Sequence, residues 1–272
     1  MESKSSKQSL ATLNTTSVKY HKIFDYKLID EDFPRWQYKN IKEKVNSVKS
    51  KTRIQREKYS NQKIKIAKEA SYLISKLPSV KFIGVTGSLS MMNSKLDSDI
   101  DLMIITKANT LWMTRLLCYM VIWLNGYKTR KPDQNNEKDK LCLNMWLDEN
   151  DLVWHKNDRN LYTAHEIAQI MPLVNKENIY EKFLYLNKWI LDYWPNAVEA
   201  KYIERSISYM GKTKTQYTTY HMLYTFLENL AFKLQHLYMS KKITREIVTP
   251  TRAIFHPHDW GKKVLTTLKA ID

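Results

Sequence analysis

Apolar and polar positions in the first half of the chain switch between helix-like and strand-like patterns. The stretch Lys39–Leu77 carries an apolar stripe at helical spacing and ends before a proline, which predicts a helix. Two short runs, Val80–Thr86 and Ile100–Ile105, are apolar without alternation and predict buried strands. Residues 110–124 predict a long apolar helix, and Gly126 is placed to end it.

The second half of the chain predicts one hairpin and then helices. Leu141–Leu147 and Leu152–Trp154 flank the turn DEND, which is typical of a β-hairpin. The spacing Thr163-x-x-Glu166 fits a capping box that opens a helix. Further helices are predicted over residues 179–194 and over about 217–240.

These patterns divide the chain into three parts. Residues 1–20 are polar and predict a flexible tail. Residues 21–160 predict an α/β (α+β) domain with a basic N-terminal helical segment, and residues 161–272 a helical C-terminal domain. A chain of 272 residues is long enough for one large or two small domains and a substantial core.

The charge of the chain favours a polyanionic partner. Lys and Arg number 44 and Asp and Glu 28, a net charge of +16. Between Lys39 and Lys68 there are eleven basic residues against two Glu. Nucleic acid is the first candidate partner because counterion release rewards clusters of Lys and Arg, and an anionic membrane surface is second. An AT-rich genome would give a similar excess of Lys, so the charge alone leaves both readings open.

Cysteine content and hydropathy exclude two broad classes. Cys118 and Cys142 stand apart in apolar surroundings, which argues against a disulfide or zinc framework and for the reducing cytoplasm. The first twenty residues lack the apolar region of a secretory signal. The most apolar stretch is interrupted by Arg115, and a membrane span needs about 20 residues, so no membrane span is expected.

The stretch VTGSLSMMNSKLDSDIDLMIIT, residues 85–106, carries the candidate chemistry. Asp99 and Asp101 are one residue apart at the start of a strand, so their side chains share a face about 6.6 Å apart along the chain. Two acids placed in this way suit Mg²⁺, or Mn²⁺, completed by waters and phosphates. Upstream, Gly87 and Ser88 form a strand-to-helix corner that can direct backbone N–H groups at a phosphate.

The ordered pair of GS and SDID resembles the signature of the DNA polymerase beta-like nucleotidyltransferase superfamily. The resemblance implies a mixed sheet with flanking helices. It also implies that Gly87 and Ser88 grip the phosphates of a nucleotide and that Asp99 and Asp101 bind divalent metal and are catalytic. Ser98, inside the same motif, joins the cofactor-binding residues.

The family uses a third carboxylate on a later strand, and the matching position here is Asn144. An amide can offer its carbonyl oxygen to a metal but cannot act as a base at neutral pH. The catalytic set is therefore predicted as Asp99, Asp101 and Asn144, with Asp148, Asp151 and Asp139, in that order, as acids that could substitute. The segments RNLYTAHEIAQIMPL, NKWILDYWPN and AIFHPHDW are similar to parts of uncharacterised bacterial nucleotidyltransferase-domain proteins.

The resulting hypothesis is a cytoplasmic, metal-dependent nucleotidyltransferase that binds an NTP, ATP among the candidates. It would move a nucleoside monophosphate to an acceptor hydroxyl, with RNA favoured as acceptor and tRNA included, and release pyrophosphate. Two alternatives stay open. One is transfer to a small molecule or a protein, as in toxin-like and antibiotic-modifying enzymes, and the other is a non-catalytic nucleotide or RNA binder. The nucleotide, any template and the oligomeric state are not indicated.

Other polar and aromatic residues favour structural roles. His256, His258 and Asp259 could form a metal clip, but a proline-constrained turn is favoured, and His165 and Arg159 are interpreted as structural and surface residues. The aromatic spacing of Trp189, Tyr193 and Trp194 is typical of a core, while Lys212–His221 could offer a stacking platform beside basic groups.

Overall fold

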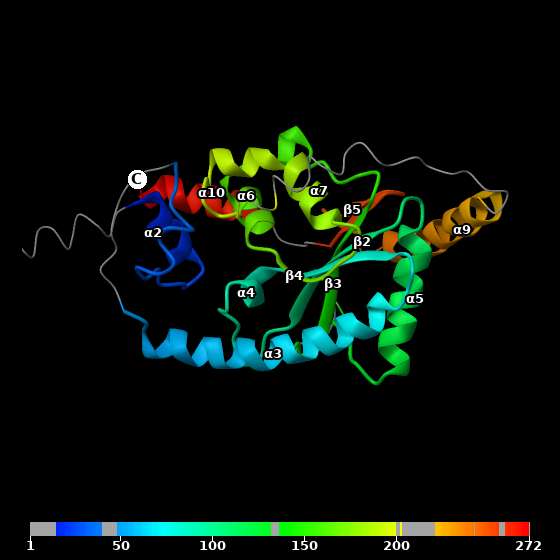
Figure 1. Ribbon diagram of the computed structural model, residues 1–272, viewed down its shortest axis with the longest axis horizontal. Coiled ribbons are helices and arrows are strands. Elements are labelled where there is room, and N and C mark those ends of the chain that lie inside the picture. The colour runs from blue at the N-terminus through cyan, green and yellow to red at the C-terminus, as the bar shows by residue number, and fades with distance from the viewer. Residues whose placement is uncertain are drawn as a thin grey trace, which may run out of the picture.

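The computed structural model describes residues 15–39, 48–131, 136–199, 202, 221–241, 243–255 and 259–271. At its centre lies a six-stranded mixed sheet in the order β4-β1-β2-β3-β6-β5 (Figure 1). Strands β2 and β3 pair in parallel, and the other neighbours pair antiparallel. The strands are β1 Val80–Val85, β2 Ile100–Thr106, β3 Leu141–Asp148, β4 Met171–Asn175, β5 Ile247–Val248 and β6 Arg252–Ile254.

Helices cover both faces of the sheet. In Figure 1, α3 runs along one side of the sheet next to α5, while α6, α7 and α10 lie on the other side with α2 beside α10. Helix α9 packs on α5 at the end of the molecule. The helices are α2 Thr16–Ile23, α3 Lys51–Ser75, α4 Gly87–Ser90, α5 Leu111–Leu124, α6 Leu161–Ala168, α7 Ile179–Leu186, α9 His221–Ser240 and α10 Trp260–Ile271, with short 3₁₀ turns at Lys156–Asp158 and Lys188–Asp192.

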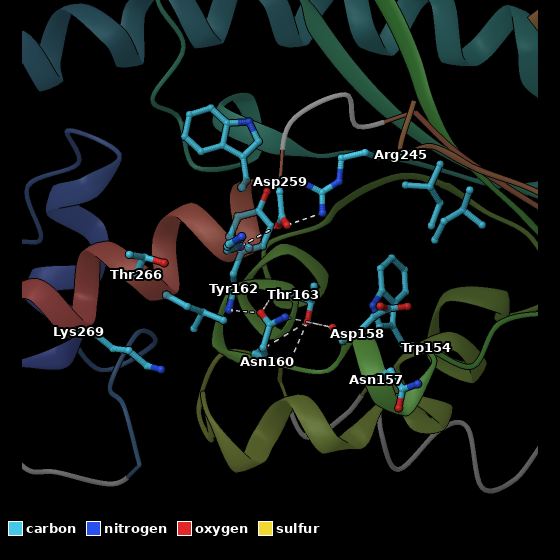
Figure 2. A pocket seen from close by; sticks show the side chains of 16 residues that line it. Trp154, Asn157, Asp158, Asn160, Tyr162, Thr163, Arg245, Asp259, Thr266 and Lys269 are labelled. Carbon is cyan, nitrogen blue, oxygen red and sulfur yellow. Dashed lines mark hydrogen bonds and ion pairs between the residues drawn. The ribbon is translucent and has the colours of Figure 1, made fainter. Parts of the chain in front are cut away.

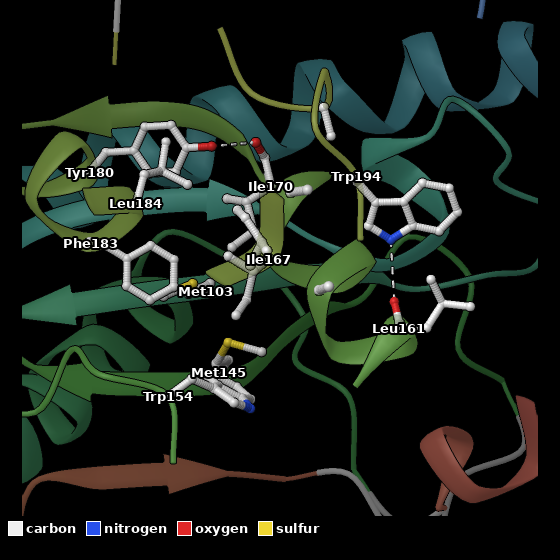
Figure 3. Close-up of a cluster of buried hydrophobic side chains, with 14 of the residues drawn as sticks. Met103, Met145, Trp154, Leu161, Ile167, Ile170, Tyr180, Phe183, Leu184 and Trp194 are labelled. Carbon is white, nitrogen blue, oxygen red and sulfur yellow. Dashed lines mark hydrogen bonds between the residues drawn. The ribbon is translucent and has the colours of Figure 1, made fainter. Parts of the chain in front are cut away.

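Strand β2 shows why its sequence lacks alternation. Leu102 and Ile104 belong to the apolar cluster under α3 and α5. Met103 and Ile105 belong to a second cluster on the opposite face, where Met103 packs near Phe183 and Ile167 (Figure 3). A strand with both faces covered needs apolar residues at every position, so the predicted buried strands at β1 and β2 are confirmed.

The apolar helix is also confirmed. α5 ends at Leu124, and Gly126 takes φ +76° while its N–H donates to the carbonyl oxygen of Trp123. Helix α3 begins later than predicted, at Lys51, where the Ser50 side chain accepts from the N–H of Arg53. No helix in the described ranges is long and apolar enough to cross a membrane.

The predicted tail of residues 1–20 is wrong at its C-terminal end. α2 begins at Thr16, and the Thr15 side chain caps it by accepting from the N–H of Val18. Tyr20 on this helix is fully buried. Ser17 and His21 are buried beside it, so the helix is anchored by a buried face in a stretch that is polar overall. Residues 1–14 lie outside the described residues.

The predicted hairpin and the all-helical C-terminal part are also wrong. β3 pairs antiparallel with β6, with Met145 opposite Ile254 and Leu147 opposite Arg252, while residues 152–154 form no strand. Residues 161–272 supply β4, β5 and β6, three of the six strands. These strands span two to five residues. Such lengths are too short to show a period, and the sheet rather than local sequence selects them.

Two helix boundaries differ from the sequence pattern. Asn160, not Thr163, caps α6: its side-chain oxygen accepts from the N–H of Thr163, and Thr163 Oγ1 accepts from the N–H of Asn160. The helix predicted over 179–194 is divided at Asn187 into α7 and a 3₁₀ turn. The Asn187 amide donates to the carbonyl oxygens of Leu152 and Phe183. α9 lies within the helix predicted over 217–240, of which residues 217–220 are outside the described residues.

Candidate metal and nucleotide site

Two carboxylates and a thiol meet where β2 begins. Asp99 directly precedes β2 and Asp101 is its second residue. Cys142 on β3 lies opposite Asp101 in the parallel register. One ligand atom from each of these three residues lies within 4.8 Å of the other two. The predicted meeting of Asp99 and Asp101 is therefore confirmed.

An irregularity in β3 brings Asn144 to the same place. Between the pairs Asp101–Cys142 and Met103–Met145, β3 has one more residue than β2, which is a β-bulge. Asn144 Nδ2 donates to Asp101 Oδ1 at 2.7 Å. Asn144 is 7% exposed, and its Oδ1 has no hydrogen-bond partner among the residues described. Asn144 thus contacts Asp101 through its amide nitrogen, and its Oδ1 is a buried oxygen without a partner in the described part of the chain.

Gly87 closes the site from the side of β1. It has φ +60°, and a Cβ at this position would lie 2.7 Å from Asp101 Oδ2. The backbone at the start of α4 therefore lies against the Asp101 carboxylate, which only glycine allows. Ser88 is exposed beside it. Ser98 Oγ donates to the carbonyl oxygen of Lys95 at 3.0 Å, and its role in cofactor binding stays a prediction.

A buried lysine from α3 holds the segment that leads into Asp99. Lys63 is 2% exposed, and its Nζ donates to the carbonyl oxygens of Leu96 and Ser98 and to Asp139 Oδ1 at 2.6 Å. These three bonds satisfy a buried ammonium completely. They also fix the chain just before the first carboxylate, so the position of Asp99 depends on α3.

The electrostatics of the site leave a deficit of positive charge. Burial raises the pKa of Asp101 to about 7, and the neighbouring charge of Asp99 adds to the shift. Burial raises the pKa of Asp99 too, while the charge of Arg130 opposes this. Arg130 donates to Asp99 Oδ2 at 3.0 Å and also pairs with Glu137 at 2.7 Å.

The donor set fits a divalent cation. Two carboxylates that repel each other and an unpartnered amide oxygen are oxygen ligands of the kind that Mg²⁺ and Mn²⁺ prefer. A cation at this point would favour the charged form of both carboxylates and offset the burial that raises their pKa values. The residues present therefore fit a bound divalent metal.

The three acids considered as substitutes for a third carboxylate are engaged elsewhere. Asp148 pairs in register with Thr106, about 16 Å along β2 from Asp101, and accepts from the N–H groups of Asn109 and Asn150. Asp151 is paired with the buried Arg252 at 2.7 Å. Asp139 is bound to Lys63. Each of the three acids therefore has partners of its own, and the substitution of one of them for a third carboxylate stays a prediction.

Sequence reasoning missed three residues near the carboxylates. Cys142 stands two residues before Asn144 in a strand, a spacing that could have placed it on the same face. Arg130 lies in a polar loop without a local signal. Glu166 on α6 has a pKa raised to about 8, first by burial and then by the charge of Asp101, which puts it within electrostatic reach of the site.

A cavity of about 540 Å³ lies between α6 and α10 (Figure 2). Arg245 reaches Asp259 at 2.6 Å across it, and Tyr162 and Trp154 supply aromatic surface. The charges of Glu166, Asp101 and Asp259 all raise the pKa of Tyr162, after burial. Tyr162 therefore stands between the cavity and the carboxylate site. The other residues that line the cavity include Trp260, Lys262, Thr266 and Lys269.

The structural readings of the remaining residues are confirmed where they are described. His165 is 3% exposed and its Nε2 lies 3.1 Å from that of His21. Arg159 Nε donates to the carbonyl oxygen of Trp154. Trp194 is fully buried in the core, with its Nε1 donating to Leu161 (Figure 3). His256, His258 and residues 212–220 lie outside the described residues.

Comparison of the chain with family models, with curated proteins and with solved structures finds no match. The functional argument therefore rests on the geometry of the site and on the sequence motif that it contains.

Proposed function

We propose that the protein is a metal-dependent nucleotidyltransferase that moves a nucleoside monophosphate from an NTP to an acceptor hydroxyl, with release of pyrophosphate. One observation carries the proposal. Asp99 and Asp101 lie side by side where β2 begins, and the backbone of Gly87 lies against the Asp101 carboxylate. A place for metal and a place for phosphate are thereby adjacent, as phosphoryl transfer requires.

The fold supports the same proposal. Strands β1, β2 and β3 form a mixed sheet whose connections carry α4 and α5, with α3 packed on β1. This agrees with the mixed sheet and flanking helices that the resemblance to the polymerase beta-like superfamily implies. The fold supports the proposal only in combination with the site, because one fold can carry many functions.

The residues of the site have distinct roles in this mechanism. Gly87 lets the phosphates approach the backbone of α4, and the exposed Ser88 hydroxyl can donate to them. Asp99 and Asp101 hold the divalent metal, Mg²⁺ or Mn²⁺, which when bound neutralises charge on the phosphates and activates the attacking hydroxyl. The amide of Asn144 fixes the orientation of Asp101 by donating to it.

The acceptor we propose is RNA. Three cations of α3, Arg53, Arg56 and Lys63, are buried and bound to internal partners, so they do not form a nucleic-acid surface. Lys58, Lys65 and Lys68, by contrast, are exposed. Spacings of seven and three residues place these lysines on one face of the helix, where they can follow a phosphate backbone.

The cavity between α6 and α10 offers a second contact for such an acceptor. Its lining combines Trp260 and Tyr162 with Arg245, Lys262 and Lys269. Aromatic faces stack on bases and the cations bind phosphates, a combination that accepts single-stranded nucleic acid without reading its sequence. In this mechanism the cavity holds the acceptor end while the hydroxyl faces Asp101.

A transfer assay tests the function. The protein would be incubated with each labelled NTP, Mg²⁺ or Mn²⁺ and total cellular RNA, and incorporated label would be measured. We expect label transfer by the wild type and its loss in the double variant Asp99→Ala, Asp101→Ala. Asp97→Ala, which removes an exposed acid from the same segment, is the matched control and should retain transfer. Unchanged incorporation by the double variant would overturn the assignment.

A second candidate is transfer to a small molecule or a protein. The volume of the cavity favours it as an alternative, since about 540 Å³ is within the range of small-molecule sites. The same assay with metabolite and protein acceptors distinguishes the two. NTP binding without transfer to any acceptor would instead identify a non-catalytic binder, in keeping with an amide at Asn144.

A further inference from the structure

Cys142 stands where a purely oxygen-based metal site has no need of sulfur. Its Sγ lies within 4.8 Å of one oxygen each of Asp99 and Asp101, and the three side chains are partly exposed, so an ion can enter from solvent. The parallel pairing of β2 with β3 sets Cys142 directly opposite Asp101. The backbone of the sheet, rather than a mobile loop, therefore holds the thiol beside Asp101.

A second observation points to a ligand at the same place. Asn144 is more than nine-tenths buried, its Nδ2 contacts Asp101, and its Oδ1 has no partner in the described part of the chain. A buried polar atom left without a partner is costly, and in native proteins it usually marks a missing ion or water. Turning the amide over would present Oδ1 to an ion held by Asp101.

The resulting donor set is mixed. Two carboxylate oxygens, one sulfur and one amide oxygen make four protein ligands, a number that suits Zn²⁺ and Co²⁺. A thiolate is a poor partner for Mg²⁺ but binds first-row transition ions well, and the affinity of such sites rises along the series from Mn²⁺ to the later ions.

We propose that Cys142 is a metal ligand and that the site prefers a thiophilic divalent transition ion to Mg²⁺. On binding, the S–H bond breaks, its proton passes to solvent, and a sulfur lone pair forms the bond to the ion. The proposal refines the metal of the proposed function but does not depend on transfer activity. It implies that Zn²⁺, present at far lower concentration than Mg²⁺, can occupy and so control the site.

Cys118 provides the internal comparison. It is fully buried in the apolar cluster under α5 and belongs to no group of metal-ligating side chains in the described residues. The protein therefore contains one thiol beside carboxylates and one thiol in an apolar core. A metal effect that involves Cys142 must survive the removal of Cys118.

Titration with Co²⁺ in the absence of nucleotide tests the proposal on the full chain. Coordination by sulfur gives a sulfur-to-cobalt charge-transfer band in the near ultraviolet, which oxygen ligands do not give. We expect the band in the wild type and in Cys118→Ser, and its loss in Cys142→Ser. The affinity for Co²⁺ should fall by at least about tenfold in Cys142→Ser while Mg²⁺ binding stays the same. Zn²⁺ should remove the band, and millimolar Mg²⁺ should not.

Several outcomes would overturn the inference: no band in the wild type, an equal band in Cys142→Ser, or displacement by millimolar Mg²⁺. Proton release on Co²⁺ binding that is larger in the wild type than in Cys142→Ser, by about one proton per bound ion, is a second readout. A band without any transfer activity would leave the metal inference standing and remove the proposed function. Transfer supported by Mg²⁺ without a charge-transfer band would leave the proposed function standing and overturn the metal inference.

Discussion

The parallel pair β2–β3 has a carboxylate near each end, one fully buried and one partly exposed, and their surroundings differ. At one end Asp148, fully buried, accepts from the N–H groups of Asn109 and Asn150 at 2.6 and 2.8 Å. At the other end Asp101 faces Asp99 and a thiol, with one hydrogen bond from Asn144. Burial raises the pKa of both, to about 6 for Asp148 and to about 7 for Asp101.

The difference separates a structural acid from a functional one. The backbone donors of Asp148 lower its pKa against the effect of burial, so the fold itself compensates the charge. The second largest influence on Asp101 is the repulsion from Asp99; a hydrogen bond from Cys142 and the charge of Arg130 oppose it but leave the pKa of Asp101 raised. A fold retains such repulsion where a ligand relieves it. Four predictions follow from this contrast, and the one with the largest expected effect concerns Asp101.

Asp101→Asn should remove transfer activity without harming the fold. The variant loses a metal ligand and a repulsive charge together, so activity should fall on the order of 10³-fold. The free energy of unfolding should stay equal or rise by up to about 1 kcal/mol. Label transfer and urea unfolding measure the two effects. If the variant retains transfer activity, or unfolds at a clearly lower urea concentration than the wild type, Asp101 is a structural acid like Asp148.

Lower pH should destabilise the fold through a second buried group, the hydrogen-bonded pair His21 and His165. His21 Nδ1 donates to the carbonyl oxygen of Ser17, so its Nε2 accepts from His165. Burial lowers the pKa of His21 from 6.5 to about 4, and lowers that of His165. The unfolded chain therefore binds protons that the folded chain refuses, and stability present above about pH 6.5 is lost as the pH falls toward 4.

The loss due to His21 alone should approach about 3 kcal/mol across that window. Urea unfolding at several pH values measures it. His165→Gln should flatten the dependence, whereas His155→Gln, which alters an exposed histidine, should not. The raised pKa values of Asp101, Asp148 and Glu166 change the wild-type stability in the opposite direction, so the difference in unfolding free energy between the wild type and His165→Gln is the quantity to follow. A difference that stays constant from pH 7 to pH 4.5 would contradict the assignment of a neutral pair.

Replacing Asp148, the structural acid, should have a smaller effect than replacing Asp101, and of the opposite kind. Stability should fall while transfer is retained. Asp148→Ala removes two hydrogen bonds that the buried carboxylate accepts from the N–H groups of Asn109 and Asn150, which should cost about 2 kcal/mol of unfolding free energy. Transfer by the folded fraction should be unchanged, because the residue lies at the far end of the strands. Urea unfolding and label transfer per folded molecule check both. Loss of transfer at full stability would mean that Asp148 does enter the site.

The same contrast explains how far the sequence alone could predict the fold. β1, β2 and α5 were predictable because each carries an apolar run that can be recognised in the local sequence. β5 and β6 were not, since two or three residues have no period and form strands only where β3 offers an edge. α2 was hidden because its buried residues, Ser17, Tyr20 and His21, are mostly polar types in a polar segment.

The site divides similarly. Asp99 and Asp101 are neighbours in sequence, so strand geometry alone predicted that they meet. The contact of Asn144 with Asp101 required a guess that two strands pair, which the resemblance supplied. Cys142 was read as an apolar residue because nothing local marks its neighbours across the sheet. The ion pair of Asp139 with Lys63 could not be predicted, since Lys63 is remote in sequence.

The smallest expected effect extends the contrast from acids to the cations of α3. Lys63 is buried and satisfied, whereas Lys58, Lys65 and Lys68 are exposed on one face. If RNA follows that face, replacing the three exposed lysines by alanine should reduce the slope of log K against log salt by about 2, near 0.7 for each lost phosphate contact. The fold should be unaffected.

Fluorescence titration of a labelled RNA between 50 and 200 mM salt, roughly the range where such slopes are measured, provides the test. The matched control replaces Lys107, Lys156 and Lys188, three exposed lysines outside α3, and so removes the same charge. Net charge alone would make both triple variants lose the same slope. A larger decrease of the salt slope in the α3 variant would locate the RNA on this helix. Equal decreases would mean that the lysines of α3 are ordinary solvated surface residues.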